Sequence, residues 1–155
     1  DYILWELGTQ NYTAKGNVNA KTENNILIAE EAGRHKDRFW GKKVTRYEDI
    51  RQKITVSADS VEGTTVKEEI NELNATGNVV IDFVDKEGLK SRVTGDNGVY
   101  SKAKATFVVS GNAKAVRSDG KTVSADTIIV HEDTNDIEAK GNSRITFVTG
   151  ENKDK

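Results

Sequence analysis

The residue types that carry most enzyme and metal chemistry are scarce and scattered in this chain. It has no cysteine and only two histidines, His35 and His131, which lie far apart and lack partners at metal-ligand spacing. Asp59 and Asp126 each end a repeated Val-Ser-Ala-Asp phrase. Repetition indicates a structural turn role, because catalysis needs one convergent set of groups with shifted pKa values. No Gly-x-Ser-x-Gly elbow or phosphate-binding glycine loop occurs. The sequence therefore predicts no enzyme activity, no metal site and no cofactor.

Composition and charge exclude further classes. The net charge is −2 at pH 7, so there is no basic stripe of the kind that binds nucleic acid, and no general attraction to an anionic membrane surface. No apolar run approaches the roughly 18 residues needed to span a membrane as a helix. The chain begins at Asp1 without methionine, which we interpret as the start of a processed, exported product. Only 35% of residues are hydrophobic, so apolar side chains must be concentrated on one face of each element.

The hydrophobic pattern has a period of two, which indicates strands with one buried face. Alternating stretches occur at 54–57, 79–84, 107–109, 123–126 and 144–148. Turn signals lie between them at 85–88, 96–98, 118–120 and 133–136. We therefore expect an all-β sandwich, barrel or jelly roll.

Two segments are less clear in the sequence. Residues 25–35 hold a β-branched start and an early glycine, Gly33, so we expect a strand followed by a turn. The charged stretch 61–71 is interpreted as a loop or a weak strand edge.

The chain also repeats itself. Gly-Asn occurs at 16–17, 77–78, 111–112 and 141–142, and Gly41 fills the gap between the first two pairs. Both residues of the pair tolerate positive φ, which is typical of turns. The resulting period of roughly 30 residues indicates a repeat architecture in which strand pairs stack on their neighbours to bury their apolar faces.

Three phrases in order carry a family resemblance. They are Tyr100 followed by Phe107–Ala113, then Asp119–Ile128, then Ile137–Asn142. Together they resemble the OstA-like domain of the LptA–LptC superfamily of lipopolysaccharide transport proteins, and the likeness covers about residues 26–148. Gly41 departs from the pattern because two lysines follow it, and residues 1–24 extend beyond the usual LptA start toward an LptC-like tryptophan strand.

The resemblance implies a fold and a role. The fold would be a twisted antiparallel β-jelly roll built from repeated strand pairs, with one domain over residues 1–150 and a charged flexible tail at 151–155. The role would be periplasmic: a carrier for the lipid A acyl chains of lipopolysaccharide during outer-membrane biogenesis. Other Lpt components would join its edge strands, and copies of the chain would associate head to tail.

A lipid-binding groove would be lined by the alternating apolar residues. The expected set is Ile26, Ile28, Val79, Ile81, Phe83, Tyr100, Phe107, Val109, Ile128, Val130, Ile145 and Phe147. The alternative is that these residues fill a closed core, that Ile26 and Ile28 belong to an ordinary edge strand, and that Tyr100 is a rim tyrosine with a solvated hydroxyl. Trp5 and Trp40 are either interface anchors or packing residues.

A basic cluster runs through Arg34, His35, Lys36 and Arg38 and continues at Lys42, Lys43 and Arg46. It either meets the phosphates of lipid A or forms a solvated strand face balanced by Glu30, Glu31, Glu48 and Asp49.

Three functions remain in competition. The first is a lipopolysaccharide-binding bridge module that assembles edge to edge. The second is an LptC-like membrane-proximal partner, which an upstream membrane helix would distinguish. The third is a structural β-solenoid or adhesin segment, against which the unequal repeat lengths argue.

Overall fold

The computed structural model describes residues 2–6, 11–21, 25–50, 53–67, 69–84, 87–134 and 136–146. Their strands form a single antiparallel sheet, which confirms the all-β prediction. The strands are β1 (Tyr2–Glu6), β2 (Asn11–Lys21), β3 (Asn25–His35), β4 (Arg38–Asp49), β5 (Ile54–Val66), β6 (Glu69–Val84), β7 (Lys90–Ser101), β8 (Thr106–Arg117), β9 (Thr122–His131), β10 (Asp136–Lys140) and β11 (Arg144–Thr146). No helix in the described part of the chain is long and apolar enough to cross a membrane.

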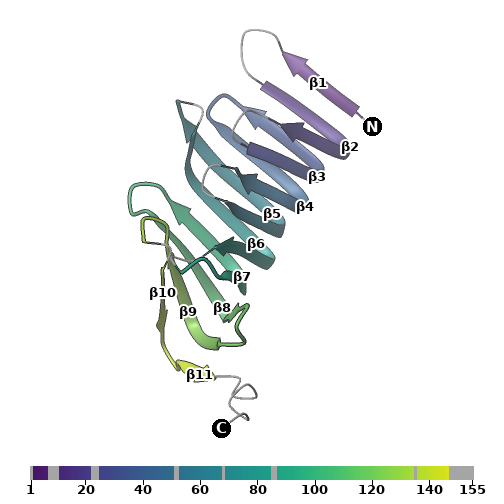
Figure 1. Ribbon diagram of the computed structural model, residues 1–155. Helices are drawn as coiled ribbons and strands as arrows, with labels where there is room; N and C mark the ends of the chain where they lie inside the picture. Colours follow the sequence, from purple (N-terminus) through teal and green to yellow (C-terminus); the bar gives the residue numbers. More distant parts are fainter. Residues whose placement is uncertain are drawn as a thin grey trace.

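The strands stack in chain order. Each of β1 to β10 pairs with its sequence neighbours, and β11 pairs with β9 beside β10. The stack therefore has β1 at one end and β9 to β11 at the other, as Figure 1 shows. Every described strand pair is antiparallel, which differs from the parallel coils of a β-solenoid.

Three of the four Gly-Asn pairs, at 16–17, 77–78 and 111–112, lie inside long strands, whereas the pair at 141–142 lies between β10 and β11. The expectation that these pairs form turns is therefore corrected for the first three. Gly77 and Asn78 have φ of +82° and +50°, and the pairing of β6 with β7 shifts between Thr76 and Val79. Asp96–Gly98, also expected to be a turn, lies within β7. Left-handed residues that interrupt a ladder bend the strand and increase its twist. The repeated phrase thus marks the middle of β2, β6 and β8 rather than their ends.

Each of three bends faces an aspartate on the preceding strand of the repeat. The Asn78 amide donates to the Asp59 carboxylate at 3.1 Å, and the Asn142 amide donates to that of Asp126 at 3.0 Å. A longer contact of 3.4 Å joins Asn112 to Asp96. The two phrases found in the sequence, Ala-Asp and Gly-Asn, are therefore the two halves of one contact between neighbouring strands. Asp59 makes this contact at the bend within β6, and Asp126 makes it at the link between β10 and β11.

The main apolar core follows the bends, and a smaller cluster of Ala14, Val18 and Ala32 lies between β2 and β3. In β6, Leu73 and Ala75 are buried before the bend, and Val79 and Ile81 are buried after it. Both halves of the strand belong to one cluster that runs from β3 to β9, against which Ile137 and Ala139 of β10 pack. The bend thus turns two arms of one sheet toward the same interior.

The two unclear segments both prove to be more regular than expected. Strand β3 continues through Gly33 to His35, and the turn follows at Lys36 and Asp37. Gly33 is needed for packing, because a Cβ there would lie 2.5 Å from the Trp40 indole. Strand β5 runs on to Val66 with Val61 buried, so of the two alternatives for 61–71, a loop or a weak strand edge, the strand holds over most of the segment.

Replacing Gly77 with alanine tests the bend, and Gly88 offers a matched control. Both have φ near +82°, so alanine at either site costs about 1–2 kcal/mol in backbone strain. Only at Gly77 would the new Cβ meet a neighbour, at 2.4 Å from an Asp59 carboxylate oxygen, whereas nothing lies within 4 Å at Gly88. Urea unfolding should show Gly77→Ala losing about 1 kcal/mol more than Gly88→Ala, through the displaced Asp59–Asn78 hydrogen bond. Equal losses would contradict this account.

Candidate functional site

Most of the expected groove residues lie together in the interior. Seven of them are at most 6% exposed and belong to the same cluster. They are Val79, Ile81, Phe83, Phe107, Val109, Ile128 and Val130. Since several are fully buried, side chains fill the middle of the interior in this structure.

The interior opens toward both ends of the stack. A cavity of about 330 Å³ lies at the end formed by β9 to β11, with Phe83, Val123 and Ile137 among its apolar walls. A smaller one, of about 120 Å³, lies at the other end and is lined in part by Leu27 and Trp40. The larger cavity is within the range of small-molecule binding sites. We call it the C-terminal pocket.

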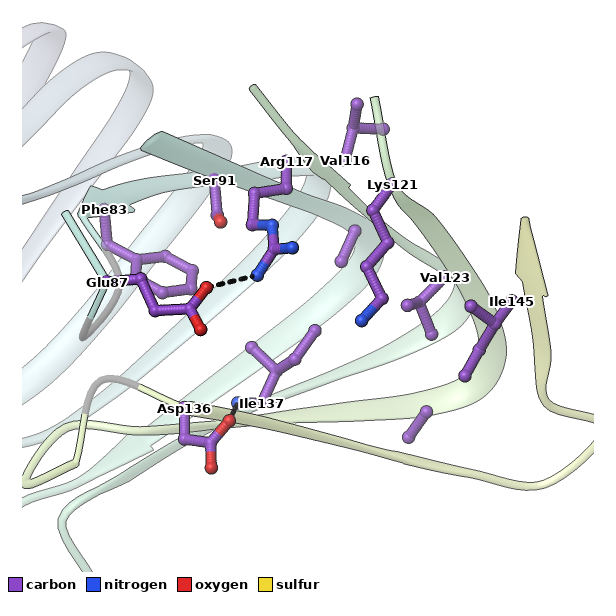
Figure 2. Close-up of a pocket in the computed structure, with 12 residues that line it drawn as sticks. Phe83, Glu87, Ser91, Val116, Arg117, Lys121, Val123, Asp136, Ile137 and Ile145 are labelled. Atoms are coloured by element: carbon purple, nitrogen blue, oxygen red, sulfur yellow. Dashed lines mark hydrogen bonds and ion pairs between the residues drawn. The ribbon is translucent and has the colours of Figure 1, made fainter. Parts of the chain in front are cut away.

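Charged residues surround the apolar floor of the C-terminal pocket. Figure 2 shows Arg117 reaching across to Glu87 above Phe83, with Ile137 on the opposite wall. The Arg117–Glu87 ion pair measures 3.0 Å, and Asp119 holds the same guanidinium at 2.7 Å. The Arg117 side chain is only 26% exposed, so two carboxylates fix its orientation over the pocket.

Tyr100 lies at the boundary between core and solvent, as either reading of it allowed. Its ring packs on Phe107 with centroids 5.8 Å apart, and its hydroxyl donates to the Glu132 carboxylate at 3.1 and 3.2 Å. Burial raises the pKa of Glu132, and the hydrogen bond from Tyr100 partly offsets that effect. A tyrosine thus anchors a half-buried carboxylate at the rim of the interior.

A second tyrosine lies in a related position. The Tyr47 hydroxyl donates to the side-chain oxygen of Asn25 at 3.0 Å, and its ring packs against the core cluster. Burial raises the pKa of Tyr47, and the charges of Asp49 and Tyr100 add to the effect. Sequence periodicity did not single out Tyr47, because it lies among charged residues at the end of β4.

Four expected groove residues are placed differently. Ile26 and Ile28 are half-buried and alternate with Leu27, which packs on the core, so they lie on the other face of β3. Leu27 lies on the same face as the buried Ala29. Ile145 is 56% exposed but lines the C-terminal pocket. Phe147 lies outside the described residues, as does the tail at 151–155.

The basic cluster of β3 and β4 is a solvated face in this structure. Lys43 pairs with Glu30 at 3.2 Å, both largely exposed, and Arg46 pairs with Glu48. The Lys42 ammonium lies 5.8 Å from the centre of the Trp40 ring. These contacts favour the balanced reading over a phosphate site, and they give Trp40 a packing role. Trp5 lies in β1, and its side chain is outside the described part.

The described residues contain no group of three potential metal ligands. His131 instead has a single carboxylate neighbour, with its Nε2 3.2 Å from the Glu138 carboxylate.

These features define a class of protein: an open, twisted β-jelly roll with an apolar interior that is accessible from its ends. The chain belongs to the family described as the LptA/(LptD N-terminal domain) LPS transport protein, whose model matches residues 6–136. Its fold is similar to that of LptH from Pseudomonas aeruginosa, described as the LptA homologous periplasmic component of the conserved lipopolysaccharide transport device. That match has a TM-score of 0.56 and 9% identity, and covers 96% of this chain and 91% of the other. No curated protein matches the chain significantly. The predicted superfamily and jelly-roll fold are confirmed.

The raised pKa of Glu132 predicts a pH dependence that Glu132→Gln should remove. The folded state holds the Glu132 proton more tightly than the unfolded state, so its contribution to stability falls as pH rises above the normal carboxyl range. Glutamine can still accept from Tyr100. At pH 7 the free energy of unfolding of the variant should be equal to that of wild type or slightly higher. The difference should stay well under about 1 kcal/mol, because the site is half exposed. This advantage should disappear below about pH 4.

Glu138→Gln is the opposite-sign control. Hydrogen bonding by His131 and the charge of Lys140 lower the pKa of Glu138, so its contribution is present at neutral pH and lost on acidification. The free energy of unfolding of each variant relative to wild type, measured with urea from pH 3 to pH 7, should therefore change in opposite directions. As pH rises it should increase for Glu132→Gln and decrease for Glu138→Gln. A Glu132→Gln variant that is less stable than wild type at pH 7 would contradict the prediction.

Proposed function

We propose that the chain is a periplasmic carrier module that holds the acyl chains of lipid A between the two arms of its bent sheet and passes lipopolysaccharide to a neighbouring module. The single observation that carries this is the continuous apolar interior, which extends along the stack and opens at both ends. Burying an acyl chain there contributes about 0.8 kcal/mol per methylene, with no covalent step. Family membership supports the lipid class, and the periplasmic description of LptH supports the location.

The revised lipid-contacting set follows the open ends of the interior. At the C-terminal pocket it comprises Phe83, Val123, Ile137 and Ile145, and at the other end Leu27 and Tyr47. The packed middle, including Val79, Val109 and Ile128, would contact lipid once the arms separate. Tyr100 lies at the rim between these regions, where its ring faces the core and its hydroxyl faces Glu132.

The edges of the stack support assembly. β1 pairs only with β2, and β10 and β11 pair only with β9, so each has one side without a strand partner among the described strands. Unpaired edges accept partner strands through their backbone groups. The contact between a first and a last strand is head to tail, so it continues from copy to copy and aligns their interiors. Other Lpt components would use the same edges.

Photo-crosslinking tests the acyl site. A photoreactive phenylalanine analogue at Phe83 or at Tyr100 should form a covalent adduct with lipopolysaccharide, because both side chains contact the interior. The same analogue at Lys114, an exposed residue of β8 between two buried alanines, should not. The adducts are measured by gel shift and mass spectrometry. Equal labelling at Lys114, or none at Phe83 and Tyr100, would contradict the proposal.

Assembly is tested at the last described strand. Thr146→Pro removes a backbone donor from β11, and proline is poorly tolerated in a paired strand. Wild-type protein should form rods whose mass rises with concentration in light scattering, whereas Thr146→Pro should remain monomeric and Thr146→Ala should behave as wild type. A wild-type monomer at all concentrations, or a closed two-fold dimer, would contradict head-to-tail assembly.

A further inference from the structure

A second, wider depression adjoins the C-terminal pocket. It has a volume of about 660 Å³ and lies over the ends of β5 to β8. Strand register explains its position, since Thr55, Asp82, Arg92 and Val116 are consecutive cross-strand partners. These four side chains are partly or largely exposed, while the neighbours of Asp82 and Arg92 in sequence are buried. The row therefore lies on the outer face of the sheet.

The depression and the pocket share walls. Phe83, Ser91, Val116 and Arg117 line both of them. Phe83 and Ser91 point inward, and Val116 is 41% exposed on the outer face. A molecule that leaves the pocket at this rim thus meets the depression without crossing open solvent. An amphiphile fits this arrangement, with its chain on the inner side and its headgroup on the outer side.

The charge of the depression is opposite in sign to that of the chain. Its described lining residues include Lys53, Lys90, Arg92 and Arg117 but only one acidic residue, Asp82. The chain as a whole has a net charge of −2. Glu87 and Asp119 offset the charge of Arg117, and Asp82 offsets that of Arg92, so the two lysines leave a surplus of positive charge at this place, which raises the local concentration of anions.

The four cations are not equivalent. Arg92 is held by Asp82 at 2.7 and 3.1 Å, and Arg117 is held by Glu87 and Asp119. Neither Lys53 nor Lys90 has an ion-pair partner among the described residues, and both are exposed. Carboxylates thus already hold both arginines, whereas each of the two lysines has an ammonium group that can donate several hydrogen bonds to a phosphate.

We propose that this depression binds the phosphorylated headgroup of the lipid whose acyl chain occupies the C-terminal pocket. The inference rests on the proposed function and adds the place and chemistry of headgroup recognition. A lipid is favoured over a free anion because the cationic surface shares four residues with an apolar cavity. Lys53 and Lys90 act as specificity residues for phosphate, and the basic cluster of β3 and β4 is not required.

The test compares lipid A carrying two phosphates with the same lipid after both are removed, each titrated in matched detergent. The double variant Lys53→Gln/Lys90→Gln should lose about threefold to tenfold in affinity for the phosphorylated lipid, as expected for two exposed charge contacts. Its affinity for the dephosphorylated lipid should equal that of wild type. Lys53→Arg/Lys90→Arg should keep the wild-type preference. The matched control Lys104→Gln/Lys114→Gln removes the same charge from exposed sites outside the depression and should also keep it.

Each other outcome overturns the inference in a distinguishable way. Unchanged binding of both lipids by Lys53→Gln/Lys90→Gln removes the headgroup site and leaves the acyl-carrier function intact. Equal loss in the Lys104→Gln/Lys114→Gln control reduces the effect to general electrostatics. Displacement of the phosphorylated lipid by inorganic phosphate at equal concentration identifies a free-anion site instead. Failure of wild-type protein to bind either lipid overturns the carrier function together with the headgroup site.

Discussion

The bend in the middle of each long strand is the constraint on which the rest of the structure depends. A flat single sheet would have no second layer to cover its apolar face. Only 35% of the residues are hydrophobic, so they must all be gathered on that one face. In β6 and β8 a left-handed Gly-Asn pair turns both arms of the strand toward one interior, and an aspartate of the preceding strand contacts the pair. Glycine is required there because a Cβ would lie about 2.4–2.6 Å from that carboxylate. Because of the bend, each arm of the sheet covers the apolar face of the other arm, as a second sheet does in a β-sandwich.

This arrangement also determines what remains open. Each strand covers the apolar face of its neighbours, but the first and last strands have a neighbour on one side only. The interior is therefore filled in the middle and accessible at the ends. Polar side chains gather at those ends and along the rim, where Arg117, Glu87 and Glu132 lie beside apolar walls. The pairing of strands in chain order therefore accounts both for the packed middle of the interior and for its open ends.

Much of this was predictable from local pattern. Period-two alternation identified parts of β5, β6, β8, β9 and β11, and seven predicted groove residues belong to the buried cluster. The repeat identified the Gly-Asn and Ala-Asp phrases. The pattern could not show that those phrases lie in mid-strand, because left-handed glycine has the same signature in a turn and in a bulge. It also placed Ile26 and Ile28 on the wrong face, since three consecutive apolar residues, 26–28, fit either register and only the partner Tyr47 selects Leu27.

The charged part of the C-terminal end could not be read from the sequence for a different reason. Lys53, Lys90 and Arg117 are separated by dozens of residues, and each alone resembles an ordinary solvated lysine or arginine at a strand end. Only the order of the sheet, in which β5 to β8 are consecutive neighbours, gathers them at one edge. The apolar pocket is assembled in the same way, from β6 to β11. When antiparallel strands pair in chain order, every second turn lies at the same edge of the sheet. Charged residues that are far apart in sequence therefore come close together in space. In this fold, charged groups therefore gather at an edge of the stack, while the apolar surface lies in its interior.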